Sequence, residues 1–344
     1  MKAGLVGYAQ TGKTTLFNAL TGLGIQTGAG RAAGTNLGVL KVPDPRIDKL
    51  SAMYKPKKTI YAEVALVDVP GPRTKGGGLE SAVIQALREA DALVVVLRGF
   101  EQGEKPDPVR ELNDFDAELV LNDQMVVERR LERVAKEKGH DREKAVLEKC
   151  LAALGEGRAL RLAGLTADDE REITSYAFLS LRPMLAVLNV GEADATKDVP
   201  PLLQKAAEDK RLAALCVCGS IEAEISTLPR EEQADFLASM GIAEPASARL
   251  IRAVYHLLDY VSFFTVGEDE VRAWNVHRGD KAPRAAGRVH SDIERGFIRA
   301  EVMKYGDLVE LGSEARMKET GKLRVEGKEY VVLDGDILHF RFNV

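Results

Sequence analysis

Residues 1–20 read MKAGLVGYAQTGKTTLFNAL, a short apolar run followed by the pattern G-x-x-x-x-G-K-[ST]. The defining positions of the pattern are Gly7, Gly12, Lys13 and Thr14. The glycines let the backbone turn tightly, so that several N–H groups point at one spot where nucleotide phosphates fit. The lysine would reach the β- and γ-phosphates, and the threonine hydroxyl would ligate Mg²⁺. The pattern therefore predicts a strand–loop–helix phosphate site in preference to a glycine-rich turn without a ligand.

The composition of the chain is that of a soluble globular protein with two or three domains. Its 344 residues carry a formal net charge of -5, and no apolar run is long enough to cross a bilayer. We expect a cytoplasmic protein with no membrane contact. The three cysteines, Cys150, Cys216 and Cys218, show no C-x-x-C pairing, which argues against a metal or redox role.

Alternating strand and helix patterns predict a parallel sheet wrapped by helices. After the first helix, strands are expected at 36–42, 62–69 and 92–97, with a helix at 79–90. The strand pattern resumes at 184–190 and 212–218.

A charged helical segment, residues 114–181, interrupts this alternation. Its apolar positions follow coiled-coil spacings at Val120, Val127, Leu131 and Val134, and again at Leu147, Leu151 and Leu154. We expect two helices folded back as an antiparallel coiled coil. The alternative is a pair of surface helices packed on the sheet.

A third region, residues 259–344, reads as a small α+β module. Its expected strands are FFTV, EVRAWNV, FIRAEVM, KEYVVL and ILHFRF, and GDLVELGSEARMKETG supplies helix. Asp334-Gly335, between the last two strands, predicts a tight hairpin. The predicted domains are thus residues 1–113 with 182–258, the insertion 114–181, and the module 259–344.

A second phosphate-site motif lies in LVDVPG, which places Asp68 at the end of a strand and Gly71 three residues later. In switch NTPases this D-x-x-G aspartate holds Mg²⁺ through water, and the glycine N–H senses the γ-phosphate. Alternatively, Asp68 is a cap or turn former. Pro72 stands where Ras-like enzymes have a water-orienting glutamine, so intrinsic hydrolysis should be slow.

The segment expected to read the base is Asn189-Val190-Gly191-Glu192, where GTPases have N-K-x-D. Its glutamate is longer than the aspartate that accepts two guanine N–H bonds, and its valine cannot cover the base as a lysine stem does. These residues alone leave the identity of the base open.

GYAQTGKTTLFNALTG, VPDPRIDKL, DVPG, NVGE, CVCGSIEAEI and the terminal run from VRAW to KEYVVLDGDILHFRFNV together resemble the YchF or Obg-like ATPase family. The resemblance spans almost the whole chain. It implies an α/β fold: a P-loop NTPase G domain with an inserted helical coiled-coil arm and a C-terminal ubiquitin-like (β-grasp) TGS domain. It also implies preference for ATP over GTP and association with ribosomes.

The resemblance assigns roles to individual residues. The phosphates would be held by Gly7, Gln10, Thr11, Gly12, Lys13, Thr14 and Thr15. Adenine would be surrounded by Asn189, Val190 and Glu192, with Ser220 closing the pocket. Lys13 and Gly71 are the expected catalytic groups, and Thr14 and Asp68 the expected Mg²⁺ ligands.

Two positions depart from the pattern of the family. Its switch threonine lies four residues before an asparagine; here Ala32 holds that place, and Thr35, adjacent to Asn36, becomes the candidate second Mg²⁺ ligand. Gln10 replaces an asparagine that in some relatives helps to bind K⁺, which makes K⁺ a further candidate ion.

The expected function is an ATP-binding, slowly hydrolysing switch NTPase on ribosomes. The alternatives are a GTPase of the same architecture and a nucleotide-binding ribosome adaptor with negligible hydrolysis. We expect a monomer that contacts ribosomal RNA, and no DNA. The RNA contact would use basic residues of the C-terminal module: Arg272, Arg278, Lys281, Arg284, Arg288, Arg295, Arg299 and Lys304. A solvated basic face is the alternative, with Trp274 and Phe297 in the core.

Overall fold

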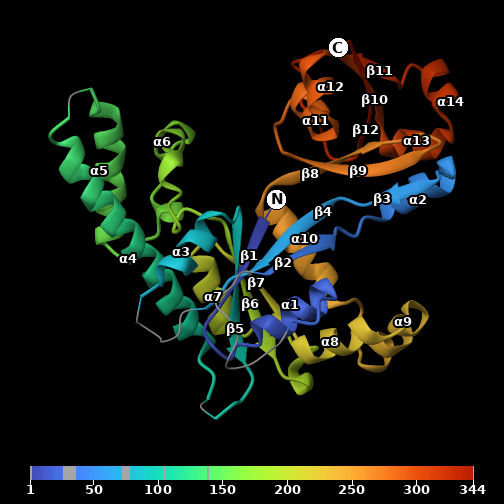
Figure 1. The fold of residues 1–344 in the computed structure, drawn as a ribbon. Coiled ribbons are helices and arrows are strands. Elements are labelled where there is room, and N and C mark those ends of the chain that lie inside the picture. Colours follow the sequence, from blue (N-terminus) through green and yellow to red (C-terminus); the bar gives the residue numbers. More distant parts are fainter. Residues whose placement is uncertain (1, 26–35, 72–77, 104, 138, 344) are drawn as a thin grey trace. The chain divides into compact units, whose positions relative to one another are not determined.

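A computed structural model describes residues 2–25, 36–71, 78–103, 105–137 and 139–343 (Figure 1). The chain divides into two compact units, each made of two segments. The first unit is Met1–Leu40 with Ala65–Leu257, and the second is Lys41–Val64 with Leu258–Val344.

The first unit is built on a six-stranded sheet of order β2-β4-β1-β5-β6-β7. Its strands are β1 (Lys2–Val6), β2 (Asn36–Lys41), β4 (Glu63–Asp68), β5 (Ala92–Gly99), β6 (Met184–Val190) and β7 (Ala213–Val217). From β4 to β7 every neighbouring pair is parallel. The strands at the centre are buried along almost their whole length, as expected for a parallel sheet covered on both faces. The predicted parallel sheet is confirmed.

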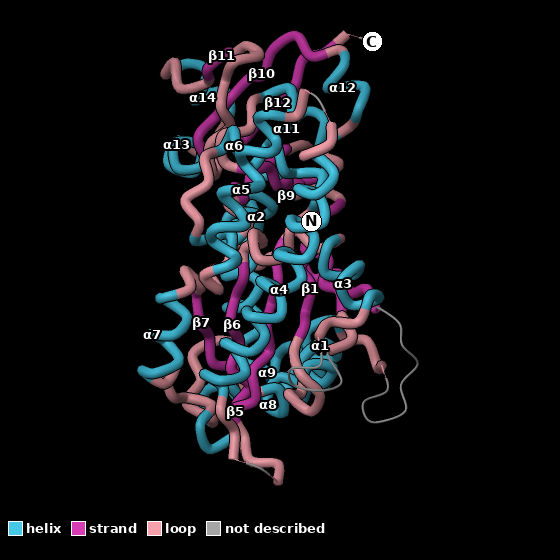
Figure 2. The backbone as a smooth tube through the Cα atoms, turned by 90° about the vertical axis from the view of Figure 1, so that its left-hand side faces the viewer, coloured by secondary structure: helices cyan, strands magenta, loops and turns pink. Residues whose placement is uncertain are grey.

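Helices lie on both sides of this sheet (Figures 1 and 2). One side carries α3 (Ser81–Arg88), α4 (Pro108–Val134) and α7 (Pro201–Asp209). The other side carries α1 (Lys13–Thr21), α8 (Gly219–Thr227) and α10 (Ala246–Leu257). Helix α9 (Arg230–Ser239) lies beyond α8 in Figure 1. None of the helices that the structure describes combines the length and apolarity needed to span a membrane.

The inserted arm begins within α4. The second half of this 27-residue helix pairs with α5 (Asp141–Gly155), and α6 (Ala167–Ile173) completes the arm. Its apolar core includes Val120, Val127, Val146, Leu147, Cys150 and Leu154. The first half of α4 packs instead into the core of the sheet, through Leu112, Phe115 and Leu119. The second half of α4 therefore pairs with another helix, as the coiled-coil prediction expected, whereas its first half packs on the sheet, as the alternative expected.

The second unit has a mixed six-stranded sheet of order β11-β10-β12-β8-β9-β3. The strands are β3 (Lys58–Ile60), β8 (Tyr260–Thr265), β9 (Glu270–His277), β10 (Phe297–Lys304), β11 (Arg324–Glu326) and β12 (Asp336–Phe342). Its helices are α2 (Pro45–Tyr54), α11 (Ala282–Val289), α12 (Ser291–Arg295), α13 (Tyr305–Leu311) and α14 (Glu314–Glu319). Helix α11 packs on β9 and β10, in agreement with the expected TGS-like fold.

The hairpin predicted at Asp334-Gly335 is wrong. Residues 328–333 form no strand and contribute one isolated bridge, and β12 pairs with β10 and β8 instead. A turn is present, with Gly335 at φ 84°. Two of its hydrogen bonds go to β8: Gly335 N donates to Ser262 O (2.8 Å), and Ser262 N donates to Asp334 Oδ1 (2.9 Å).

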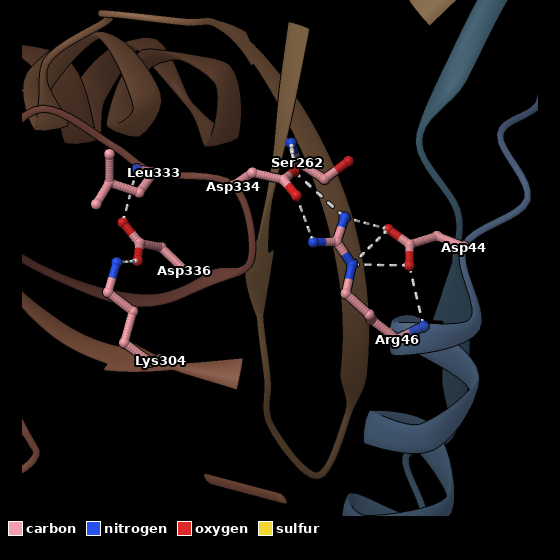
Figure 3. A network of polar contacts seen from close by, with 7 residues as sticks. All are labelled: Asp44, Arg46, Ser262, Lys304, Leu333, Asp334 and Asp336. Carbon is pink, nitrogen blue, oxygen red and sulfur yellow. Dashed lines mark hydrogen bonds and ion pairs between the residues drawn. The ribbon is translucent and has the colours of Figure 1, made fainter. Parts of the chain in front are cut away.

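Residues 41–64 belong by their contacts to the second unit, although the predicted domain 1–113 includes them. Arg46, at the start of α2, bonds both Asp44 and Asp334, with 2.6 Å between its Nη1 and Asp334 Oδ2 (Figure 3). Strand β3 pairs in parallel with β9. A pattern read along the chain shows where such a segment is helical, but not that its partners lie almost three hundred residues away.

Candidate functional site

The loop after β1 has the backbone geometry of a phosphate loop. Gly12 precedes α1 in the left-handed region at φ 78°, and Gln10 also has a positive φ of 65°. A β-carbon at Gly7 would lie 2.4 Å from Val96 O, and one at Gly12 would lie 2.2 Å from Asn189 Nδ2. Both positions thus require glycine because neighbouring atoms occupy the space of any side chain.

The other predicted phosphate-binding residues lie in this loop and in the first turn of α1. The Thr11 side chain is buried, and its hydroxyl donates to Tyr8 O (3.2 Å). Lys13, Thr14 and Thr15 are half-buried at the N-terminus of the nine-residue helix α1. A helix N-terminus favours anions through its N–H groups and its dipole, so these residues surround a place suited to phosphates.

The D-x-x-G motif lies beside this loop. Asp68 ends β4, is 1% exposed and pairs in register with Leu5 of β1. A β-carbon at Gly71 would lie 1.9 Å from Gly7 O and 3.4 Å from Lys13 Nζ. The structure therefore brings both halves of the predicted phosphate site together.

The donor atoms near the loop are of the kind that Mg²⁺ accepts. Thr14 supplies a hydroxyl and Asp68 a carboxylate, and Mg²⁺ is usually held by one or two such ligands together with substrate phosphates. Among the described residues no group of three His, Cys, Asp or Glu forms a metal cage. Thr35, the predicted second ligand, and Pro72 lie outside the described residues.

Asn189 connects three parts of the site. Its side chain is 4% exposed, its Nδ2 donates to Thr11 O (2.9 Å), and its Oδ1 accepts from Gly219 N (2.9 Å). The amide is thus bonded at both ends to backbone groups of the phosphate loop and of the start of α8. Val190 is also buried, whereas Glu192 and Ser220 are exposed; Ser220 Oγ lies 3.2 Å from Cys218 Sγ.

Phe100 is a candidate that sequence reasoning missed. It follows β5, and its Cε1 lies 3.7 Å from the place of a β-carbon on Gly12, while its Cβ lies 3.9 Å from that place on Gly191. The ring therefore lies between the phosphate loop and the base-reading segment. Its position directly after the buried strand β5 was the available signal, since ligands of parallel sheets bind at the carboxyl ends of strands.

All these loops follow the carboxyl ends of parallel strands, and they therefore meet at one edge of the sheet. The edge offers backbone N–H groups, one lysine, a hydroxyl, a buried carboxylate and an aromatic ring. This set can bind a nucleoside triphosphate with Mg²⁺ and can stabilise the charge that develops when its terminal phosphate is transferred.

The basic residues of the C-terminal module are largely paired with acids. Ion pairs within 4.0 Å join Arg272 to Glu270, Arg278 to Asp259, Lys281 to Glu329, Arg284 to Glu294, Arg295 to Asp292 and Lys304 to Asp336. For Arg288 and Arg299 the described part of the chain supplies no acidic group within that distance. Phe297 is in the core, and Trp274 is partly buried beneath the Arg272 guanidinium, 3.9 Å from the ring centroid.

Two family models match the chain. Residues 2–129 match the family MMR_HSR1, described as 50S ribosome-binding GTPase. Residues 260–343 match the family YchF-GTPase_C, described as a protein of unknown function (DUF933).

Whole-length relatives were also found. The chain is 41% identical over 362 residues to the ribosome-binding ATPase YchF of Haemophilus influenzae, covering 100% of this chain and 99% of the relative. It is 34% identical to Obg-like ATPase 1 of rice, Oryza sativa, covering 100% of this chain and 92% of the relative. The solved structure of the Schizosaccharomyces pombe YchF GTPase superposes with a TM-score of 0.89 at 29% identity, covering 99% of this chain and 97% of that one.

Proposed function

Because the chain belongs to the family of YchF and Obg-like ATPases, we propose that it is an ATP-selective, Mg²⁺-dependent, slowly hydrolysing switch NTPase that acts on the ribosome. The observation that carries the proposal is the approach of Gly71 to Gly7 O and Lys13 Nζ, which unites the phosphate loop with the switch motif. The relatives named ATPase support the choice of nucleotide, and their ribosome-binding name supports the partner.

The chemistry is attack of water on the γ-phosphate in line with the leaving oxygen. Lys13 and the N–H groups at the start of α1 stabilise the charge on the phosphate oxygens, and the Gly71 N–H contacts the γ-phosphate. Thr14 and Asp68 would hold Mg²⁺, which supplies further charge neutralisation when it is bound. Pro72 offers no group to orient water, so unassisted turnover is slow.

Base selectivity follows from the groups that remain for the base. The Asn189 amide is engaged by Thr11 O and Gly219 N, so the backbone of Val190 and the surroundings formed by Glu192 and Ser220 are left to contact adenine. A backbone C=O and N–H pair can accept from the adenine amino group and donate to its ring nitrogen. Phe100 supplies an aromatic face at the same edge.

Parallel titration with ATP and GTP in Mg²⁺ tests the assignment. We expect ATP to bind at least about tenfold more tightly, which corresponds to ~1.4 kcal/mol. Equal affinity or a preference for GTP would support the GTPase alternative. The description of the MMR_HSR1 family and the name of the fission-yeast structure both contain the word GTPase. Hydrolysis by the wild-type protein that is abolished in Lys13→Ala would exclude the adaptor alternative, in which hydrolysis is negligible.

Cosedimentation with ribosomes across a salt series tests the partner. Among the described residues no acidic group lies within 4.0 Å of Arg288 or Arg299, so their joint replacement by alanine should weaken ribosome binding at low salt. Arg278→Ala is the matched control, because Arg278 is already paired with Asp259 at 2.8 Å. Binding that ignores salt and both changes would place the contact on the helical arm.

The remaining expectations are proposals with direct tests. We propose a cytoplasmic monomer that binds no DNA, which sedimentation of the free protein and a DNA-binding assay would check. K⁺ is a candidate second ion beside Gln10, an exposed residue whose own φ is positive. Faster turnover in K⁺ than in Na⁺, lost in Gln10→Ala, would support that site.

A further inference from the structure

Tyr8 is the first variable residue of the phosphate loop, and its side chain points away from solvent. It is 4% exposed. Its hydroxyl donates to Glu118 Oε1 of α4 at 3.3 Å, and its ring meets Phe115 of the same helix edge to face, with 6.5 Å between centroids. Burial and the Glu118 carboxylate raise the pKa of Tyr8 well above its usual range, so the hydroxyl keeps the proton that it donates.

The backbone of Tyr8 is bonded within the loop as well. Its carbonyl accepts from the buried Thr11 hydroxyl at 3.2 Å, and Thr11 O in turn accepts from Asn189 Nδ2 at 2.9 Å. Tyr8 is therefore held on one side by α4 and on the other by the loop that surrounds the phosphates. A shift of the tyrosine would be passed to the N–H groups of that loop.

Helix α4 makes a second contact with the same edge of the sheet. Glu111 Oε2 accepts from Arg98 N at 3.0 Å, two residues before Phe100. Glu111 and Glu118 are buried carboxylates seven residues apart, so they share one face of α4. The helix then continues without interruption to Val134, where it packs on α5 in the arm.

We propose that Tyr8 is a positioning residue for the phosphate loop, and that its hydrogen bond to Glu118 sets the loop against the helix that carries the arm. The inference rests on the proposed nucleotide-binding function and deepens it. The hydroxyl–carboxylate distance of 3.3 Å is longer than the usual value of about 2.7 Å for a hydrogen bond between two oxygens.

The test compares Tyr8→Phe, Glu118→Gln, the double variant and Tyr176→Phe in the full-length protein. Tyr176 is the matched control, because its hydroxyl donates to Glu143 and its ring stacks on Phe178, within the arm. Each protein is assayed for thermal midpoint without nucleotide, for Mg-ATP and Mg-GTP affinity, and for kcat and KM.

We expect Tyr8→Phe to lower the affinities for Mg-ATP and Mg-GTP by a similar factor of about five, which corresponds to the loss of one net hydrogen bond. The two factors should be similar because the loop holds the phosphates and not the base. Glu118→Gln should weaken them less, since an amide oxygen still accepts, and Tyr8→Phe should mask its effect in the double variant. Tyr176→Phe should leave affinity unchanged, even where its thermal midpoint falls. These readouts separate positioning of the loop from a merely structural role.

Three outcomes overturn the inference. Affinities of Tyr8→Phe equal to wild type, the same loss in Tyr176→Phe, or additive losses in the double variant would each show that the bond does not position the loop. Failure of the proposed function looks different, because a wild-type protein that prefers GTP would still lose affinity for both nucleotides in Tyr8→Phe. A wild-type protein that binds neither nucleotide would remove both proposals.

Discussion

Replacing Gly71 by alanine would place a methyl carbon where another atom already lies. The added carbon would be 1.9 Å from Gly7 O, whereas real β-carbons stay at least 3.0 Å from other heavy atoms, so the backbone must give by about 1 Å. Both neighbours are backbone or phosphate-site groups, and the strain falls on the loop that orients the γ-phosphate. Misplacement of reacting groups by about 1 Å costs ~100-fold in rate, or ~2.7 kcal/mol of transition-state stabilisation.

Single-turnover hydrolysis of labelled ATP measures this loss, with the thermal midpoint recorded on the same preparations. Gly155→Ala is the matched control, because a β-carbon there meets nothing within 4 Å and the residue ends helix α5 in the arm. We expect Gly71→Ala to remain folded, at an overpacking cost of about 1–3 kcal/mol, while its kcat/KM falls ~100-fold. A folded Gly71→Ala protein that hydrolyses ATP like wild type would refute the role of Gly71 at the γ-phosphate.

Four further substitutions probe other parts of the site and the arm. Phe100→Ala should lower the equilibrium affinity for ATP by about tenfold, because the base loses the aromatic ring on which it stacks. Unchanged affinity would show that the base binds elsewhere. Thr14→Ala should impair Mg²⁺-dependent binding and hydrolysis, and Thr35→Ala should do so only if Thr35 is the switch ligand; an unaffected Thr35→Ala protein would show that it is not. Hydrogen bonds from Arg130 lower the pKa of Glu143 to about 2, so its stabilisation of the arm is full above the ordinary glutamate pKa and is lost as pH falls from there toward 2. Glu143→Gln should flatten acid denaturation of the arm in that range, as followed by circular dichroism, and an unchanged profile would contradict this.

The phosphate site was predictable because its chemistry is local in sequence. Gly7, Gly12 and Gly71 must be glycines for reasons of space, and such constraints leave a fixed pattern of letters. The two hydrogen bonds by which the Asn189 amide joins the phosphate loop to α8 were not predictable, since their partners are backbone atoms of Thr11 and Gly219 that any residue carries. Sequence patterns identify side chains with special chemistry better than side chains that bond to main chain.

The errors in the second unit have a common physical cause. Residues 328–333 are apolar enough for a strand, and Asp334-Gly335 is a strong turn pair, yet the turn bonds to Ser262 and Arg46, from segments distant in sequence. Local propensity for a hairpin therefore loses to non-local hydrogen bonds. The Arg46–Asp334 bond and the pairing of β3 with β9 tie residues 41–64 to this unit, which no periodicity within those residues could indicate.

The count of basic residues in the C-terminal module overstates the charge that it can offer to RNA. Counterion release favours binding only in proportion to the phosphates that are newly neutralised. An arginine such as Arg278, at 2.8 Å from Asp259, gains a phosphate by giving up a carboxylate, and exposed ion pairs of this kind are worth ~0–1 kcal/mol. The exchange therefore costs little but also leaves the local charge of the pair near zero. A ribosome contact of this unit must draw its salt dependence mainly from cations such as Arg288 and Arg299, for which the described residues supply no acidic group within 4.0 Å.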